Sequence, residues 1–201
     1  VYLADKGYVE KLRNFTREKD ILLIFDEVQT GIGRTGKLFA YENYNIEPDI
    51  MSLAKALGNG VPVGAIIAKD EVMQAFEPGT HASTFGGNPL ASSAVIATLN
   101  TFTDENILKN CNDAGMHLYE GLLGLKEKYS FIKEIRGIGL IWGVELSIDG
   151  NPIAAEILKE GVIINCTKIN TLRLVPPLII KNEEIDIFLE IADRIFERQN
   201  T

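Results

Sequence analysis

The stretch ILLIFDEVQTGIGRTGK, residues 21–37, decides the fold, because an apolar run leads directly into two carboxylates and a glycine-rich loop. A continuous apolar run of this length is typical of a strand that lies in a parallel sheet and is covered on both faces. The side-chain period of two places Asp26 and Val28 on one face at the carboxyl end of that strand. Ligands bind at this end of open α/β sheets, so the stretch predicts a ligand site.

The glycine-rich loop also nearly matches a phosphate-binding loop. The segment from Gly31 to Lys37 has the glycine and lysine spacing of G-x-x-x-x-G-K-[ST]. Leu38, however, stands where a Ser or Thr hydroxyl must bind Mg²⁺, and the acidic strand precedes the loop instead of following it. We therefore expect no nucleotide hydrolase activity, and no binding of Mg-ATP that depends on Lys37.

The composition argues against several classes of partner. The 201 residues carry a formal net charge of −8, which disfavours nucleic acid and anionic membrane surfaces. Cys111 and Cys166 lack CxxC spacing, so we expect two free thiols in a reducing, cytoplasmic compartment. His81 and His117 lack the spacing of metal ligands, and we expect no metal site. No signal peptide or membrane-spanning run is visible.

The remaining elements alternate around the opening stretch. Tyr8, Leu12 and Phe15 recur at helical spacing before it, and residues 49–55 and 63–69 read as two further strands after it. A helix is expected to begin at Asn88, which can cap it, because Pro89 suits the first helical position. The helix that follows has one apolar stripe, formed by Ile107, Cys111, Ala114, Leu118, Leu122 and Leu125.

Beyond residue 130 the pattern changes to short strands and helices. Strands are expected over 132–146, broken by glycines, and over 162–166 and 171–175; helices are expected over 151–161, capped by Asn151, and over 183–198. We therefore predict an α/β chain in two parts, a half-sheet with helices over residues 1–98 and an α+β module over residues 99–201.

Lys55 follows the second strand at the same end of the sheet as Asp26. Its apolar neighbours are expected to desolvate it partly, which lowers the pKa of a lysine and makes its amine nucleophilic toward an aldehyde. A carboxylate and an apolar side chain such as Val28 suit an aromatic cation. Together these residues suggest pyridoxal phosphate. Taken singly, an aspartate there is more often a turn or cap residue, and a lysine is more often solvated.

Four segments in this order, residues 22–36, 48–65, 80–91 and 172–180, resemble the class III, pyridoxal-phosphate-dependent aminotransferases. The resemblance covers essentially the whole chain. It implies a fold-type I transferase, with the second half of the large mixed-sheet, cofactor-binding domain in 1–98 and the small C-terminal α+β domain in 99–201. It also implies transfer of the amino group of N-acetylornithine to 2-oxoglutarate in arginine biosynthesis.

The resemblance implies a role for each matching residue near the cofactor. Lys55 would bind the cofactor covalently and then carry the proton between the substrate Cα and the cofactor C4′. Asp26 would pair with the protonated pyridine nitrogen, which keeps the ring an electron sink. Val28 would pack on the ring face, and Gln29 would lie at the phenolic oxygen.

Two further sites follow from the same resemblance. Thr84, with its neighbour Ser83, would reach the phosphate of a cofactor held mainly by the other subunit, which implies a homodimer. Arg173 would grip the substrate α-carboxylate through a bidentate contact. The alternative for Arg173 is a solvent-facing strand residue.

Other functions stay open. The donor could be ornithine, succinylornithine or 4-aminobutyrate, since donor specificity in the family depends partly on residues upstream of Val1. Complete members are longer, and this chain lacks their main phosphate-binding loop, the aromatic residue that stacks on the ring and the acidic residue that separates the half-reactions. We therefore expect the chain alone to be inactive. A catalytically silent unit of folding or assembly is the second hypothesis.

Overall fold

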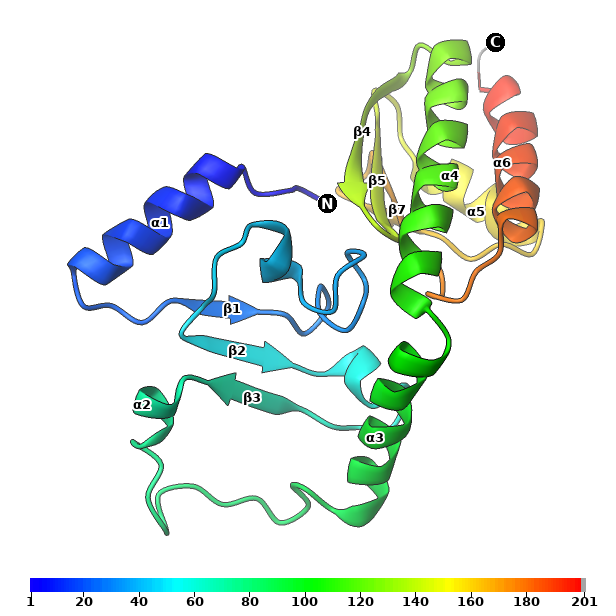
Figure 1. The fold of residues 1–201 in the computed structure, drawn as a ribbon. Coiled ribbons are helices and arrows are strands. Elements are labelled where there is room, and N and C mark those ends of the chain that lie inside the picture. Colours follow the sequence, from blue (N-terminus) through cyan, green and yellow to red (C-terminus); the bar gives the residue numbers. More distant parts are fainter. Residues whose placement is uncertain (200–201) are drawn as a thin grey trace. The chain divides into compact units, whose positions relative to one another are not determined.

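The computed structural model describes residues 1–199 and divides them into two compact units (Figure 1). The first unit is Ala4–Leu108, and the second unit runs from Lys109 onward and includes Val1–Leu3. The chain therefore crosses between the units twice, once after Leu3 and once after Leu108. That the two units correspond to a cofactor-binding part and a small domain, with the division after residue 98, stays a prediction.

A three-stranded mixed sheet forms the centre of the first unit. Its strands are β1 (Ile24–Asp26), β2 (Ile50–Leu53) and β3 (Ala65–Ala68), in the order β1-β2-β3. β1 and β2 are parallel, with Asp26 opposite Ser52, whereas β3 runs antiparallel to β2 (Figure 1). The carboxyl ends of β1 and β2 therefore lie at the same edge of the sheet, as expected.

The helices of the first unit precede, separate and follow these strands. They are α1 (Lys6–Glu18), the 3₁₀ helices η1 (Ala40–Asn43) and η2 (Lys55–Leu57), α2 (Asp70–Met73) and α3 (Pro89–Asp104). The Asn88 side chain accepts the backbone N–H of Ala91 at 3.0 Å, which confirms the predicted start of α3.

The expectation that the first strand is covered on both faces is wrong. Leu23 is buried against α1, and Phe25 packs on the same cluster. The alternating residues Leu22 and Ile24 are 52% and 59% exposed. The physical reason is that residues 4–108 supply a covering layer for one face of β1 only, so the apolar run there includes residues that face outward.

Asp49, just before β2, joins the elements of the first unit. Its buried carboxylate accepts the Leu23 backbone N–H at 2.8 Å and pairs with Arg13 of α1 at 2.8 Å. The Lys69 ammonium, just after β3, lies 2.9 Å away. Burial alone would raise the pKa of Asp49, but these contacts outweigh it and lower the pKa from 3.8 to about 2.

The second unit is an antiparallel sheet covered by helices. The strands are β4 (Ile132–Ile138), β5 (Ile141–Leu146), β6 (Asn165–Thr167) and β7 (Thr171–Leu174), in the order β4-β5-β7-β6. The helices are α4 (Ile107–Lys128), α5 (Asn151–Lys159) and α6 (Asn182–Glu197) (Figure 1). All six residues of the predicted apolar stripe of α4 are buried, five of them in the core of this unit.

The predicted cap of α5 is wrong. Asn151 lies inside the helix, and the preceding residue Gly150 occupies the cap position. The reason is that the Asp149 carboxylate accepts both the backbone N–H and the side-chain N–H of Asn151, each at 2.8 Å. The Asp149 carboxylate thus satisfies the first unpaired backbone N–H of the helix, which is that of Asn151 itself.

Three features of residues 1–199 concern the thiols, the membrane spans and the metal sites considered from the composition. Cys111 and Cys166 are free thiols. No helix in this part of the chain is long and apolar enough to cross a membrane. The described His, Cys, Asp and Glu side chains form no cluster of three that could hold a metal ion.

Candidate active site

Asp26 lies at the carboxyl end of β1, and one of its two carboxylate oxygens accepts hydrogen bonds. Oδ1 accepts the backbone N–H of Val28 at 3.0 Å and the hydroxyl of Ser52, its neighbour on β2, at 3.3 Å. The other oxygen, Oδ2, accepts no hydrogen bond from residues 1–199, and the residue is exposed. An oriented carboxylate with a free oxygen can pair with a protonated ring nitrogen.

Lys55 begins the turn that follows β2. It has a φ of +50°, a left-handed conformation that is uncommon for a residue with a side chain. The turn is closed by hydrogen bonds from Leu57 N–H to Ala54 C=O at 3.0 Å and from Gly58 N–H to Lys55 C=O at 3.1 Å. Among residues 1–199, no carboxylate pairs with the Lys55 amine. A strained backbone that presents an unpaired amine is typical of functional positions.

The desolvation expected for Lys55 is absent from this chain. The residue is exposed, although Leu57 beside it is buried. The apolar neighbours pack inward on Met51 and Leu53, so they bury the turn and not the lysine side chain.

Glu27 fastens the loop that follows Asp26. The residue is 2% exposed. Its carboxylate accepts the backbone N–H groups of Ala40 at 2.6 Å and Tyr41 at 2.8 Å. Burial raises the pKa of Glu27, and these two hydrogen bonds oppose the rise. The Glu27 backbone N–H also donates to Ser52 at 3.0 Å, so the residue ties the loop to β2.

Val28 and Gln29 lie in this loop, at the first two positions of a turn, and both are partly exposed. β1 ends at Asp26, so the alternation that placed Val28 on the face of Asp26 stops before Val28. The hydrogen bond between the two residues nevertheless keeps Val28 next to the carboxylate.

Ser83 and Thr84 are exposed in the segment between α2 and α3. The Ser83 hydroxyl accepts the Gly86 backbone N–H at 2.9 Å and thereby holds a local turn. Phe85, next to Thr84, is 80% exposed. Within the first unit this segment is therefore open to solvent.

Arg173 belongs to the second unit, in the middle of β7. It lies opposite Gly143 of β5 and opposite Asn165 of β6. Its Nε atom is buried and has no hydrogen-bond partner, and no carboxylate of residues 1–199 forms an ion pair with it. A guanidinium in this state can take a carboxylate from outside the chain.

The structure thus brings Asp26, Val28 and Lys55 to one edge of the first sheet, whereas Arg173 lies in the other unit. The sequence reasoning missed Ser52 and Glu27, which orient Asp26 and its loop. Ser52 could have been found as the one hydroxyl in an apolar strand, at the register position opposite Asp26.

Three comparisons with known proteins show the family and the fold of the chain. The family model described as aminotransferase class-III matches residues 1–196. An acetylornithine aminotransferase of Methanocaldococcus jannaschii is 46% identical over 198 residues, which are 98% of this chain and 49% of that protein. One from Caldanaerobacter subterraneus is 50% identical over 196 residues, 97% of this chain and 50% of that protein.

A solved ornithine aminotransferase from Toxoplasma gondii superposes with a TM-score of 0.92 at 35% identity, over 98% of this chain and 49% of that one. The predicted α/β class, with the fold of the fold-type I transferases, is thereby confirmed. The chain belongs to the class III aminotransferase family. It spans about half the length of the curated relatives that it matches.

Proposed function

We propose that this chain provides the lysine, the ring-binding carboxylate and the substrate-binding arginine of a pyridoxal-phosphate-dependent aminotransferase. The donor proposed is N-acetylornithine and the acceptor 2-oxoglutarate, as in arginine biosynthesis. The observation that carries the proposal is the identity of 46% and 50% to two proteins named acetylornithine aminotransferase. Solved relatives named ornithine aminotransferase and acetylornithine aminotransferase are 35% and 33% identical, so the solved structures do not separate these two donors.

The residues present fit pyridoxal phosphate. Asp26 offers a free carboxylate oxygen, Lys55 an amine without an ion-pair partner, and Thr84 an exposed residue with a hydroxyl. The Toxoplasma relative is described with partial occupancy of this cofactor at its active site. When bound, the cofactor supplies an electron sink for the carbanion formed at the substrate Cα.

Each residue then has a physical task. Asp26 would hold a proton on the ring nitrogen by its negative charge, and Ser52 and the Val28 N–H keep the carboxylate oriented. Lys55 would bind the cofactor aldehyde and carry the proton at the substrate Cα. Val28 would pack on the ring face, and Gln29 would lie at the phenolic oxygen.

Arg173 would bind the substrate α-carboxylate with two parallel hydrogen bonds, which fixes the face of Cα that is presented. Ser83 and Thr84 would bind the cofactor phosphate of a second subunit, so we propose a homodimer with shared sites. A cytoplasmic location is proposed with it, and the two free thiols suit a reducing compartment.

The test is an amino-transfer assay on the natural polypeptide that carries this sequence, with glutamate as the measured product. We expect N-acetylornithine to have the highest kcat/KM among the four donors named above. Lys55→Ala should abolish turnover, and Asp26→Asn should lower kcat about 100-fold. Activity that survives Lys55→Ala would contradict the proposal, and a different best donor would reassign the substrate alone.

A further inference from the structure

A row of four paired residues crosses the sheet of the second unit. Arg136 of β4 lies opposite Gly143 of β5, which lies opposite Arg173 of β7, and Asn165 of β6 completes the row. Directly paired residues in antiparallel strands share a face, so both arginines leave the same face of the sheet. Their strands are two apart, which puts about 10 Å between their backbones.

Glu145 is within reach of both arginines. It lies two residues beyond Gly143 on β5, opposite Glu134 on one side and Thr171 on the other. It is therefore a diagonal neighbour of Arg136 and of Arg173 alike, at a separation that long side chains can span. The carboxylate pairs with Arg136 Nη1 at 2.6 Å and not with Arg173.

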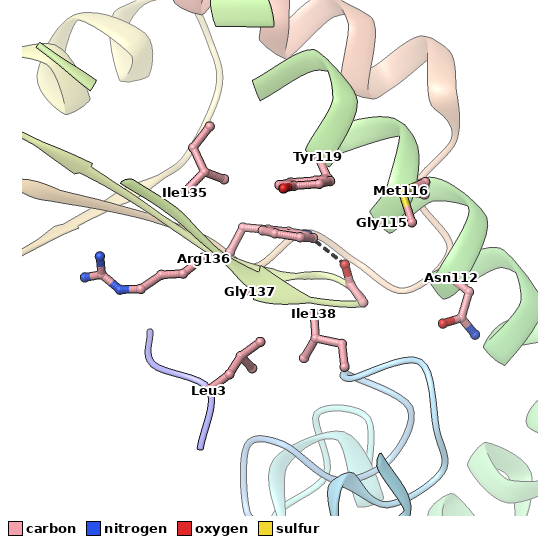
Figure 2. A pocket seen from close by; sticks show the side chains of 11 residues that line it. Leu3, Asn112, Gly115, Met116, Tyr119, Ile135, Arg136, Gly137 and Ile138 are labelled. Carbon is pink, nitrogen blue, oxygen red and sulfur yellow. Dashed lines mark hydrogen bonds between the residues drawn. The ribbon is translucent and has the colours of Figure 1, made fainter. Parts of the chain in front are cut away.

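Arg136 is held in place by several contacts. The Glu134 carboxylate lies 2.7 Å from Nη1, and Nε donates to the carbonyl of Val1. The guanidinium lies 4.1 Å from the centre of the Tyr2 ring, a distance suited to a cation–π contact. Figure 2 shows Arg136 at the rim of a cavity of about 500 Å³, with its guanidinium pointing away from the Tyr119 ring.

We propose that Arg136 is a positioning residue that keeps the Glu145 carboxylate away from Arg173, and so leaves Arg173 free for the substrate carboxylate. The proposal rests on the role of Arg173 in the proposed function. If Arg136 lost its charge, Glu145 would have one guanidinium left within diagonal reach, that of Arg173. The buried Arg173 Nε–H, which has no acceptor, would then gain one.

The first experiment needs no ligand. The Nε–H resonance of Arg173 is followed by NMR in the ¹⁵N-labelled chain. Arg136→Gln should shift it downfield, because Glu145 now accepts from it, and Arg136→Gln/Glu145→Gln should return it to the wild-type position. An unchanged resonance in Arg136→Gln, or a shift that persists in the double variant, would overturn the proposal.

Glutarate, a dicarboxylate that cannot react, is the probe in the second experiment. Titrated against the same resonance, it should bind Arg136→Gln about fivefold more weakly than wild type, the size expected of one partly exposed ion pair. The double variant should recover the wild-type affinity. A further outcome is that glutarate leaves the Arg173 resonance of the wild type unchanged while the shifts of the first experiment occur. In that case Arg173 does not bind carboxylates, as the proposed function requires, but Arg136 does keep Glu145 away from it.

Three further variants control for structure. Lys168→Gln removes another cation, whose Nζ lies 5.7 Å from the centre of the Tyr2 ring. Lys168 pairs with no carboxylate among residues 1–199, so this variant should leave the Arg173 resonance and the glutarate affinity unchanged. Arg136→Lys keeps the cation and should stay close to wild type. Arg136→Met keeps the packing of the aliphatic stem and replaces Arg136→Gln if that variant does not fold. A Lys168→Gln effect as large as that of Arg136→Gln would contradict the proposal.

Discussion

At the scale of single residues, Lys55 combines chemical use with local strain. A left-handed φ costs a residue with a Cβ about 1–2 kcal/mol, because the Cβ approaches the following carbonyl oxygen. Here the φ is +50°, and the turn that imposes it is closed by two backbone hydrogen bonds. Glycine would suit this backbone better, so the presence of lysine indicates that the amine is needed there.

Replacing Lys55 tests this strain. Lys55→Gly should raise the free energy of unfolding by about 0.5–1 kcal/mol, because glycine adopts this φ without a steric cost. Lys55→Ala keeps a Cβ and serves as the matched control, with no gain expected. Urea unfolding followed by circular dichroism measures both. Equal stability of the two variants would show that the backbone here is not strained.

The Asp49 carboxylate stabilises the fold and is not one of the candidate active-site residues. Its folded-state pKa is lowered from 3.8 to about 2. A lowered pKa means that the ionised form stabilises the folded state above pH 3.8, and that this contribution is lost as the pH falls toward 2. The shift corresponds to about 2 kcal/mol.

Asp49→Asn should therefore lower the free energy of unfolding near neutral pH by about 3 kcal/mol, since it leaves the buried Arg13 without its partner. The difference from wild type should shrink as the pH falls from about 4 toward 2. Glu10→Gln, at an exposed position of α1, is the control and should change little. A deficit that stays constant with pH would contradict the ion-pair account.

At the scale of elements, two of the three glycines of α4 have opposite surroundings. A Cβ added at Gly115 would lie 2.2 Å from the carbonyl oxygen of Gly139, in the turn between β4 and β5. A Cβ added at Gly124 would meet nothing within 4 Å. Gly115 therefore permits the helix to approach the hairpin backbone, whereas Gly124 has no steric requirement.

These surroundings predict opposite effects of the same substitution. Gly115→Ala should lower the free energy of unfolding by about 1–3 kcal/mol, because backbone must move to admit the methyl group. Gly124→Ala should raise it by about 0.5–1 kcal/mol through helix propensity. Thermal unfolding of the two variants side by side is the measurement. The same sign of change in both would mean that packing at Gly115 is looser than described.

The sequence predicted those elements whose signals are local. The start of α3 at Asn88 and the buried stripe of α4 depend on neighbours three or four residues away, and both were correct. The covering of β1 depends on which other elements pack on it, which the strand's own residues do not encode, and Ile24 is exposed. The cap of α5 was missed because Asp149, two residues before Asn151, accepts the first backbone N–H of the helix.

In the candidate site, too, residues with a local sequence signal could be predicted and residues that act through distant contacts could not. Asp26 and Lys55 could be found because each directly follows an apolar run. Ser52 and Glu27 act through contacts across strands and loops, and these contacts appear only with the register. Binding of cofactor and substrate by these residues stays a prediction, which the amino-transfer and labelling experiments test.

At the scale of the whole molecule, the first unit has an exposed apolar sheet face. Leu22, Ile24 and Ile66 are each more than half exposed. Ile24 lies two residues before Asp26 on β1, and Ile66 lies opposite Ser52, so this face also contains the candidate ring-binding carboxylate. The chain matches about half the length of its curated relatives, so those proteins have further sequence outside the matched part.

The most direct test of the central claim, that Lys55 and Asp26 together hold one pyridoxal phosphate, is a labelling experiment. The natural polypeptide is incubated with the cofactor, reduced with borohydride and mapped by mass spectrometry. We predict that the pyridoxyl group is found on the peptide containing Lys55, and that Asp26→Asn reduces this labelling while the exposed surface variant Glu10→Gln does not. Labelling spread evenly over other lysines, or unaffected by Asp26→Asn, would contradict the account.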